Sequence, residues 1–123
     1  MRILLVDDSS MMRALQKQCM LMLGIGSDEI VEAENGQVAI EEFSAEPFDL
    51  ILTDRDMPVM DGLAFVKAVR SQNTDIPIVM LTTESGHSNV MTALEAGVSD
   101  YLVKPFAPDE FNARLRKWLP LNV

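Results

Sequence analysis

The chain has 123 residues, of which 48% are apolar, and its formal net charge is −9. A chain of this length suits one domain, so we expect a single domain over residues 1–123. The acidic balance argues against nucleic acid and against anionic membranes as partners. No apolar stretch approaches the length of a membrane span. The lone Cys19 cannot form an internal disulfide, which favours a reducing, cytoplasmic location.

The first half of the chain alternates short apolar runs with helical patterns. Strands are expected at residues 3–6, 30–33 and 50–53, and the mixed polarity of residues 30–33 suggests an edge strand. The first helix should begin near Ser9 or Ser10 and end at Gly24 and Gly26. Its apolar residues at helical spacing are Met12, Leu15, Cys19 and Met22. A second helix should follow Asn35-Gly36, with Ala39, Ile40 and Phe43 on one face.

The second half continues the alternation. Leu63, Val66 and Val69 mark a third helix, and residues 76–81 read as a fourth buried strand. The lone His87 is expected in a surface loop. A fourth helix carrying Val90, Met91 and Leu94 should end at Gly97, and residues 101–103 form a fifth strand. The last helix should start at Pro108, with an apolar stripe of Phe111, Leu115 and Trp118.

Strands that alternate with helices, and that are apolar along their whole length, predict an α/β fold. Such strands are buried on both faces, which is typical of a parallel sheet. Helices then cover both sides, giving a three-layer, doubly wound arrangement around five strands. Handedness and short connections leave few topologies, but the residues alone do not fix the strand order.

Polar residues occur where four of the predicted strands end. The first strand ends on Asp7-Asp8, the third on Asp54, the fourth on Thr82 and the fifth on Lys104. All are carboxyl ends, and a parallel sheet brings these to one edge, where open α/β folds bind their ligands. This concurrence is much more specific than a single Asp, which is also common in turns.

The residue types at this edge suit phosphoryl chemistry. Clustered carboxylates repel one another unless a cation joins them, and an all-oxygen ligand set suits Mg²⁺. Lys104 offers a point charge for a phosphate, and the Thr82 hydroxyl can donate a hydrogen bond to it. The carboxylate of Asp54 can itself be the nucleophile and form an aspartyl phosphate.

At these positions the chain resembles the receiver domains of two-component response regulators, in particular the single-domain, CheY-like type. The resemblance covers essentially the whole chain. It is carried by Asp7-Asp8, Asp54, Met57-Pro58, Asp61-Gly62, Thr82 and Lys104-Pro105. It implies a flavodoxin-like sheet of strand order 2-1-3-4-5.

The resemblance also implies roles for individual residues. Asp54 would be the phosphoacceptor, while Thr82 and Lys104 would contact the phosphoryl group. Tyr101 would be the aromatic switch that turns inward when Thr82 moves, and the bond before Pro105 would be cis. Magnesium would be held by Asp7, Asp8 and Asp54, with the backbone carbonyl of Asp56.

Such a protein is a phosphorylation-activated switch rather than a conventional enzyme. A separate histidine kinase would supply the phosphoryl group. A monomeric chain would signal through the face around Tyr101, Lys104 and Phe106, formed by the fourth helix, fifth strand and fifth helix. The partner there would be a flagellar motor component in chemotaxis. A phosphotransfer protein in a phosphorelay is the alternative, and the chain could also belong to a longer regulator.

Other interpretations of the chain, and the roles of a few residues, stay open at this level. Asp54-Arg55-Asp56 also fits the Asp-x-Asp of haloacid-dehalogenase-type phosphatases, although that family places the pair after its first strand. A degenerate receiver that only binds is disfavoured by the complete residue set. Arg55 is either a solvated rim charge or a residue that steers an anionic donor or a partner. Asp56 and Glu84 occupy positions where receivers tune dephosphorylation.

Overall fold

The computed structural model describes residues 1–120, so residues 121–123 of the predicted domain lie outside the described part. A five-stranded parallel sheet forms the middle layer, in the order β2-β1-β3-β4-β5. Its strands are β1 (Ile3–Val6), β2 (Ile30–Ala33), β3 (Leu50–Asp54), β4 (Ile78–Thr82) and β5 (Asp100–Val103). The predicted fold class and strand order are confirmed, and β2 is an edge strand.

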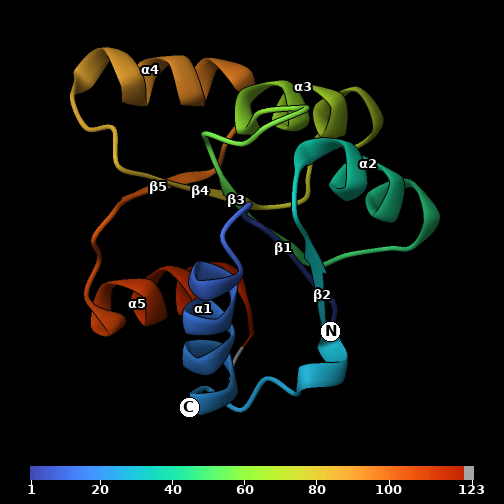
Figure 1. The fold of residues 1–123 in the computed structure, drawn as a ribbon, viewed down its shortest axis with the longest axis vertical. Coiled ribbons are helices and arrows are strands. Elements are labelled where there is room, and N and C mark those ends of the chain that lie inside the picture. Colours follow the sequence, from blue (N-terminus) through green and yellow to red (C-terminus); the bar gives the residue numbers. More distant parts are fainter. Residues whose placement is uncertain (121–123) are drawn as a thin grey trace.

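Helices cover both faces of the sheet (Figure 1). One face carries α1 (Ser10–Met22) and α5 (Pro108–Trp118), and the other carries α2 (Gly36–Ala45), α3 (Gly62–Gln72) and α4 (His87–Ala96). A single 3₁₀ turn, η1 (Ser27–Glu29), leads into β2. No helix within residues 1–120 combines the length and apolarity needed to cross a membrane.

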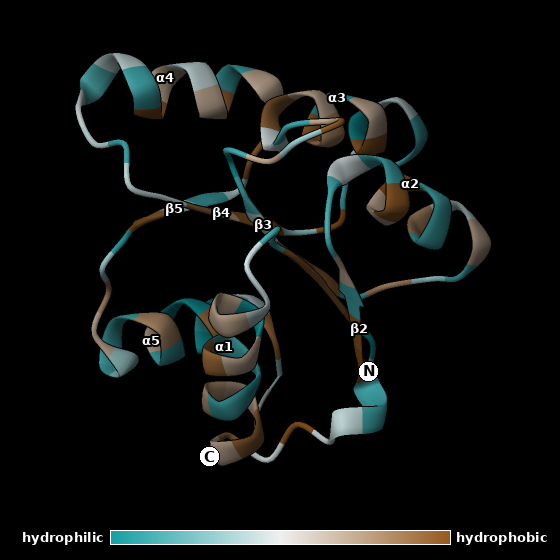
Figure 2. Cartoon of the chain, viewed as in Figure 1, coloured by the Kyte–Doolittle hydropathy of each residue, from teal (hydrophilic) through white to brown (hydrophobic). Residues whose placement is uncertain are grey.

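The three inner strands are buried along their whole length, and the strands in the middle of the sheet are largely coloured as hydrophobic in Figure 2. Their alternating side chains supply two separate cores, one under α1 and α5 and one under α2, α3 and α4. Phe111 and Leu115 of α5 lie in the first core, and Phe65 and Val66 of α3 lie in the second. Burial on both faces holds these strands rigid, and their carboxyl ends are fixed with them.

Two predicted boundaries shift by a few residues. β4 begins at Ile78 rather than Ile76, because Pro77 has no N–H to donate to the ladder. His87 is the first residue of α4, not a loop residue, although its side chain is exposed.

The predicted apolar stripe of α1 was partly wrong. Leu15 is 51% exposed and Met22 is 75% exposed. The helix instead buries Gln16, Cys19 and Met20. Gln16 lies on the buried face because its side chain donates a hydrogen bond to Asp7. Its polarity therefore hid, in the sequence pattern, which face of the helix is buried.

The stripe of α4 differs from the prediction for another reason. Small residues, Ala93 and Ala96, face the sheet, while Met91 and Leu94 are 39% and 45% exposed. The larger side chains of Met91 and Leu94 therefore contribute to the surface rather than to the core.

Candidate functional site

The structure brings the predicted polar residues to one edge of the sheet. Asp7 follows the last residue of β1, while Asp54 and Thr82 are the last residues of β3 and β4. Lys104 follows β5, and its N–H donates to the Thr82 carbonyl at 2.7 Å. β1, β3 and β4 are neighbours in the sheet, so the site is built on rigid strand ends.

Lys104 is the cation at the centre of the site. Its Nζ lies 3.0 Å from Oδ2 of Asp7 and 3.3 Å from Oδ1 of Asp54. The side chains are 12% exposed for Lys104, 1% for Asp7 and 11% for Asp54. One ammonium group thus neutralises part of the negative charge of two buried carboxylates, which would otherwise repel each other.

Asp7 is held in place from several sides. The backbone N–H of Ser9 donates to its Oδ1 at 2.9 Å, and Nε2 of Gln16 donates to its Oδ2 at 3.5 Å. Arg13 donates to the backbone carbonyl of Asp7 at 2.6 Å. Sequence reasoning did not find Gln16 or Arg13. The only signal was that Gln16 lies four residues before Met20, in the phase of the buried face.

The pKa of the Asp54 carboxyl is perturbed by its surroundings. Burial raises its pKa to about 6, with a further upward effect from the charge of Asp7. The charge of Lys104 and the N–H of Arg55, which donates to Oδ1 at 2.9 Å, act against this rise in pKa. The carboxylate is therefore partly desolvated yet ionised at neutral pH, which suits a nucleophile.

Asp7, Asp8 and Asp54 together could hold a metal ion. Each offers a carboxylate oxygen, and these oxygens lie within 4.8 Å of one another. Asp8 is exposed while the other two are buried, so one side of the cluster is open to water. A few hard oxygen ligands beside a wet face fit Mg²⁺, which retains several of its waters. The predicted role of the Asp56 carbonyl stays a prediction.

Thr82 and Tyr101 meet at a common neighbour, Glu84. Thr82 is fully buried, and its Oγ1 accepts a hydrogen bond from the Glu84 N–H at 3.1 Å. The hydroxyl of Tyr101 donates to the Glu84 carbonyl at 2.6 Å. Tyr101 is half-buried and packs against the core under α2, α3 and α4, and its hydroxyl reaches from β5 to the loop after β4.

Three backbone features mark the loops at this edge of the sheet. A Cβ on Gly62 would collide with the backbone carbonyl of Asp54, so only glycine allows α3 to start so close to β3. Val59 lies in the same β3–α3 loop at φ 71° and is 81% exposed. The Lys104–Pro105 peptide bond is cis, which is the isomer that the resemblance implied.

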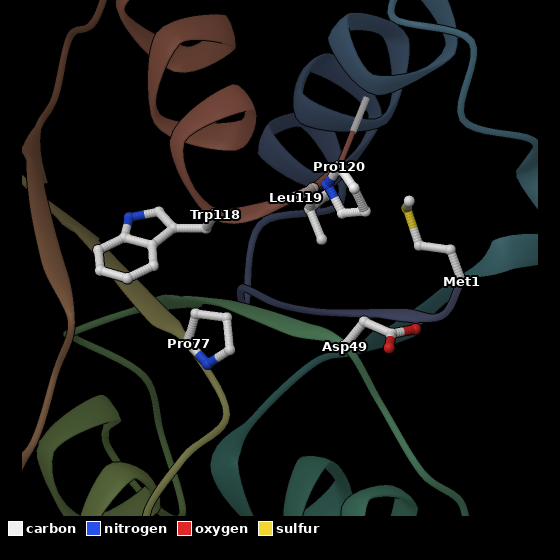
Figure 3. A pocket seen from close by; sticks show the side chains of 6 residues that line it. All are labelled: Met1, Asp49, Pro77, Trp118, Leu119 and Pro120. Carbon is white, nitrogen blue, oxygen red and sulfur yellow. The ribbon is translucent and has the colours of Figure 1, made fainter. Parts of the chain in front are cut away.

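A separate hollow lies at the opposite edge of the sheet (Figure 3). It has a volume of about 340 Å³ and is lined by Met1, Asp49, Pro77, Trp118, Leu119 and Pro120. Asp49 and Pro77 precede the amino ends of β3 and β4. The hollow is therefore remote from Asp54 and plays no part in the site.

The fold and this acidic edge define a response-regulator receiver. Residues 3–116 match the family model described as the response regulator receiver domain, and the chain belongs to this family. Within the family it is CheY-like, and members of this type are signalling switches rather than classical enzymes.

The similar proteins agree with this assignment. The chain is 44% identical to chemotaxis protein CheY1 of Helicobacter pylori over 125 residues, which covers 99% of both chains. It is 44% identical to a CheY homologue of Campylobacter jejuni, covering 94% of this chain and 89% of the relative. The structure of CheY4 of Vibrio cholerae superimposes with a TM-score of 0.87 at 37% identity, covering 96% and 98%. The family match favours a receiver over a haloacid-dehalogenase-type phosphatase for Asp54-Arg55-Asp56.

Proposed function

We propose that this chain, as one receiver domain over residues 1–123, takes up a phosphoryl group on Asp54 and thereby changes its affinity for a partner. The observation that carries the proposal is the cluster at the carboxyl edge. There Lys104 lies 3.0 Å from Asp7 and 3.3 Å from Asp54, with Asp8 beside them.

The transfer follows from these groups. A carboxylate oxygen of Asp54 attacks the phosphorus of the donor, an O–P bond forms, and the bond to the leaving group breaks. With acetyl phosphate as donor the leaving group is acetate, and with a histidine kinase it is the imidazole of the phosphohistidine. Lys104 Nζ is already 3.3 Å from Asp54 and can turn its hydrogen bonds to the new phosphoryl oxygens.

The acidic cluster supplies the ligands for the ion that this step requires. Asp7, Asp8 and Asp54 would hold Mg²⁺, and the Asp56 carbonyl would add a fourth protein ligand. Bound Mg²⁺ would neutralise charge on the phosphoryl oxygens during transfer. Asp7 is pre-oriented for this role by Ser9 and Gln16.

The signal would leave through the face formed by α4, β5 and α5. Its apolar part is exposed: Met91 and Leu94 on α4, and Val103 on β5 at 37%. Thr82 and Tyr101 connect Asp54 to this face, because both hydrogen-bond to Glu84 in the loop before α4. A shift of Thr82 toward a phosphoryl group would move that loop and, with it, the environment of Tyr101.

We place this switch in the cytoplasm, downstream of a histidine kinase and upstream of a flagellar motor component. The similarity to the chemotaxis proteins of Helicobacter pylori and Campylobacter jejuni supports the chemotaxis assignment. A phosphotransfer protein is the alternative recipient, and incubation with each partner separates the two roles.

The test is uptake of phosphate at Asp54. Wild type and Asp54→Asn are incubated with acetyl phosphate and Mg²⁺, and their intact masses are compared. We expect one added phosphoryl group on wild type, none on the variant, and none when a chelator removes Mg²⁺. Equal labelling of the two proteins would move the acceptor to another residue.

A further inference from the structure

Arg55, directly after the acceptor, is not a solvated rim charge. Its side chain is only 14% exposed, and its Nη1 lies 3.2 Å from Oε2 of Glu84. The same nitrogen lies 3.5 Å from Oδ1 of Asn89 on α4. Asn89 is itself tied to the loop, since its Nδ2 donates to the Ser85 carbonyl at 2.9 Å. The guanidinium is therefore held on the loop between β4 and α4.

Glu84 is the residue through which this loop contacts the rest of the site. Its N–H donates to Thr82 Oγ1, its carbonyl accepts from the Tyr101 hydroxyl, and its carboxylate pairs with Arg55. These contacts connect Glu84 to three different residues of the proposed switch. The ion pair is the one among them that joins the loop to the strand that carries Asp54.

The backbone of Arg55 cannot move far from the acceptor. Its N–H donates both to Asp54 Oδ1 at 2.9 Å and to the Leu81 carbonyl at 3.2 Å. Its carbonyl accepts from the Gly62 N–H at 2.7 Å. With the backbone fixed directly beside Asp54, the side chain of Arg55 is the part that can exchange partners.

We propose that Arg55 is a phosphoryl-binding residue that Glu84 holds back in the unphosphorylated protein. A phosphoryl group arriving at Asp54 carries two negative charges and competes with the single charge of Glu84 for the guanidinium. Arginine suits such an exchange because its fork can bind phosphate oxygens in pairs. This inference rests on the proposed function of Asp54 and names a further residue for the same reaction.

We call this arrangement, in which Glu84 holds Arg55 away from the phosphorylation site, the latch. It predicts that the effect of substituting Glu84 depends on the presence of Arg55. Glu84→Gln weakens the hold on Arg55 and leaves the guanidinium available to the donor. We expect labelling by acetyl phosphate to become faster on the order of twofold to fivefold, the range that corresponds to a partly exposed ion pair. Hydrolysis of the aspartyl phosphate should become slower, because Arg55 then stabilises the phosphorylated form.

The decisive comparison repeats Glu84→Gln in an Arg55→Gln background. If Glu84 acts by holding Arg55, its substitution has no effect on either rate once Arg55 is absent. If Glu84 only repels the anionic donor, its substitution accelerates labelling equally in both backgrounds. The second outcome overturns the proposal, as does an unchanged rate for Glu84→Gln in the wild-type background.

Two controls accompany the cycle. Glu95→Gln removes one negative charge from the exposed surface of α4, where the described residues give Glu95 no ion pair, and it should leave both rates unchanged. Arg55→Lys, combined with Glu84→Gln, keeps the charge without the fork and should restore part of the acceleration that is absent in the Arg55→Gln background. Melting temperatures are measured for every variant so that a folding defect is recognised.

The experiment also distinguishes failure of this inference from failure of the proposed phosphorylation of Asp54. If wild type is labelled but the effects of the Glu84 and Arg55 substitutions are additive, the latch is contradicted and the phosphoacceptor role of Asp54 stands. Absence of labelling on wild type contradicts both.

Discussion

At the scale of single residues, the site depends on one ammonium group shared by two carboxylates. Asp7 is 1% exposed, so the loss of Lys104 would leave its charge buried and without its nearest cation. Uncompensated buried charge is costly, whereas a cation that serves two acids lowers the cost of both. The arrangement keeps Asp54 close to a positive charge without binding it in a closed, bidentate pair.

The raised pKa of Asp54 has a consequence for stability. An unfolded Asp has a pKa of about 4, whereas the folded value is about 6. The folded state binds this proton more tightly, so stability falls as pH rises from about 4 to about 6 and the cost is complete above that range. In metal-free protein at pH 7.5, Asp54→Asn should therefore raise the free energy of unfolding by about 1 to 3 kcal/mol.

Denaturant unfolding in the presence of a chelator checks this at two pH values. The stabilisation should be large at pH 7.5 and should nearly disappear near pH 4, where Asp54 is protonated in the folded state and about half protonated in the unfolded state. A gain of equal size at both pH values would show that desolvation of the ionised carboxylate is not its cause.

At the scale of elements, the loop from β3 to α3 is set by a backbone contact. Gly62 lies where a Cβ would meet the Asp54 carbonyl, and its N–H donates to the carbonyl of Arg55. Gly62→Ala should lower the free energy of unfolding by about 1 to 3 kcal/mol, the usual cost of overpacking. Because the displaced atoms belong to the acceptor residue, labelling of Asp54 should also slow.

The matched control is Gly26→Ala, at the start of η1. A Cβ there would approach Oδ1 of Asp28 at 2.6 Å, but this atom is the end of an exposed side chain that can turn away. We expect a much smaller loss of stability in denaturant unfolding and unchanged labelling. Equal effects of the two substitutions would argue against a role for the close approach to Asp54.

The element scale also shows where sequence patterns succeed. Strands 3–6 and 50–53 were predicted closely because both of their faces are buried, so every residue carries the signal. The buried faces of the helices were harder to predict, because the exposed Leu15 and the buried Gln16 of α1 invert the usual relation between polarity and burial. Both exceptions have a local cause: Gln16 orients Asp7, and Leu15 lines a hollow beside Lys104 and Phe106.

At the scale of the whole molecule, the parallel sheet made the main features of the site predictable. Residues far apart in the sequence, such as Asp7 and Asp54, meet because parallel strands end at the same edge. The contacts of Arg13 and Glu84 were not predictable in the same way. They depend on the side-chain directions of a helix and a loop, which no periodicity in the sequence encodes.

The switch is a property of the whole molecule. In the proposed switch, Thr82 would connect Asp54 to the exposed face through its hydrogen bond with Glu84, while Asp54 and the acidic cluster are still present in a variant that lacks this hydroxyl. Thr82→Ala should therefore still be labelled by acetyl phosphate. It should gain less affinity for a motor-component peptide on activation, because the shift cannot exceed the difference in interaction between the two states.

Beryllofluoride serves as the phosphoryl mimic, and peptide affinity is titrated with and without it. Thr83→Ala, at the exposed neighbouring position, is the matched control and should respond as wild type does. Full activation of Thr82→Ala would show that the coupling to the α4, β5 and α5 face bypasses this hydroxyl.

The chain contains one tyrosine and one tryptophan, and the sheet separates them. Tyr101 packs into the core under α2, α3 and α4, whereas Trp118 packs against the core under α1 and α5 and donates from Nε1 to Asp100 at 2.9 Å. The molecule thus carries a natural pair of optical probes, one for each layer. Indole emission reports the integrity of the layer on the opposite face of the sheet from Tyr101, while the phenol of Tyr101 reports the switch, so loss of the fold and motion of the switch can be followed in one sample without an added label.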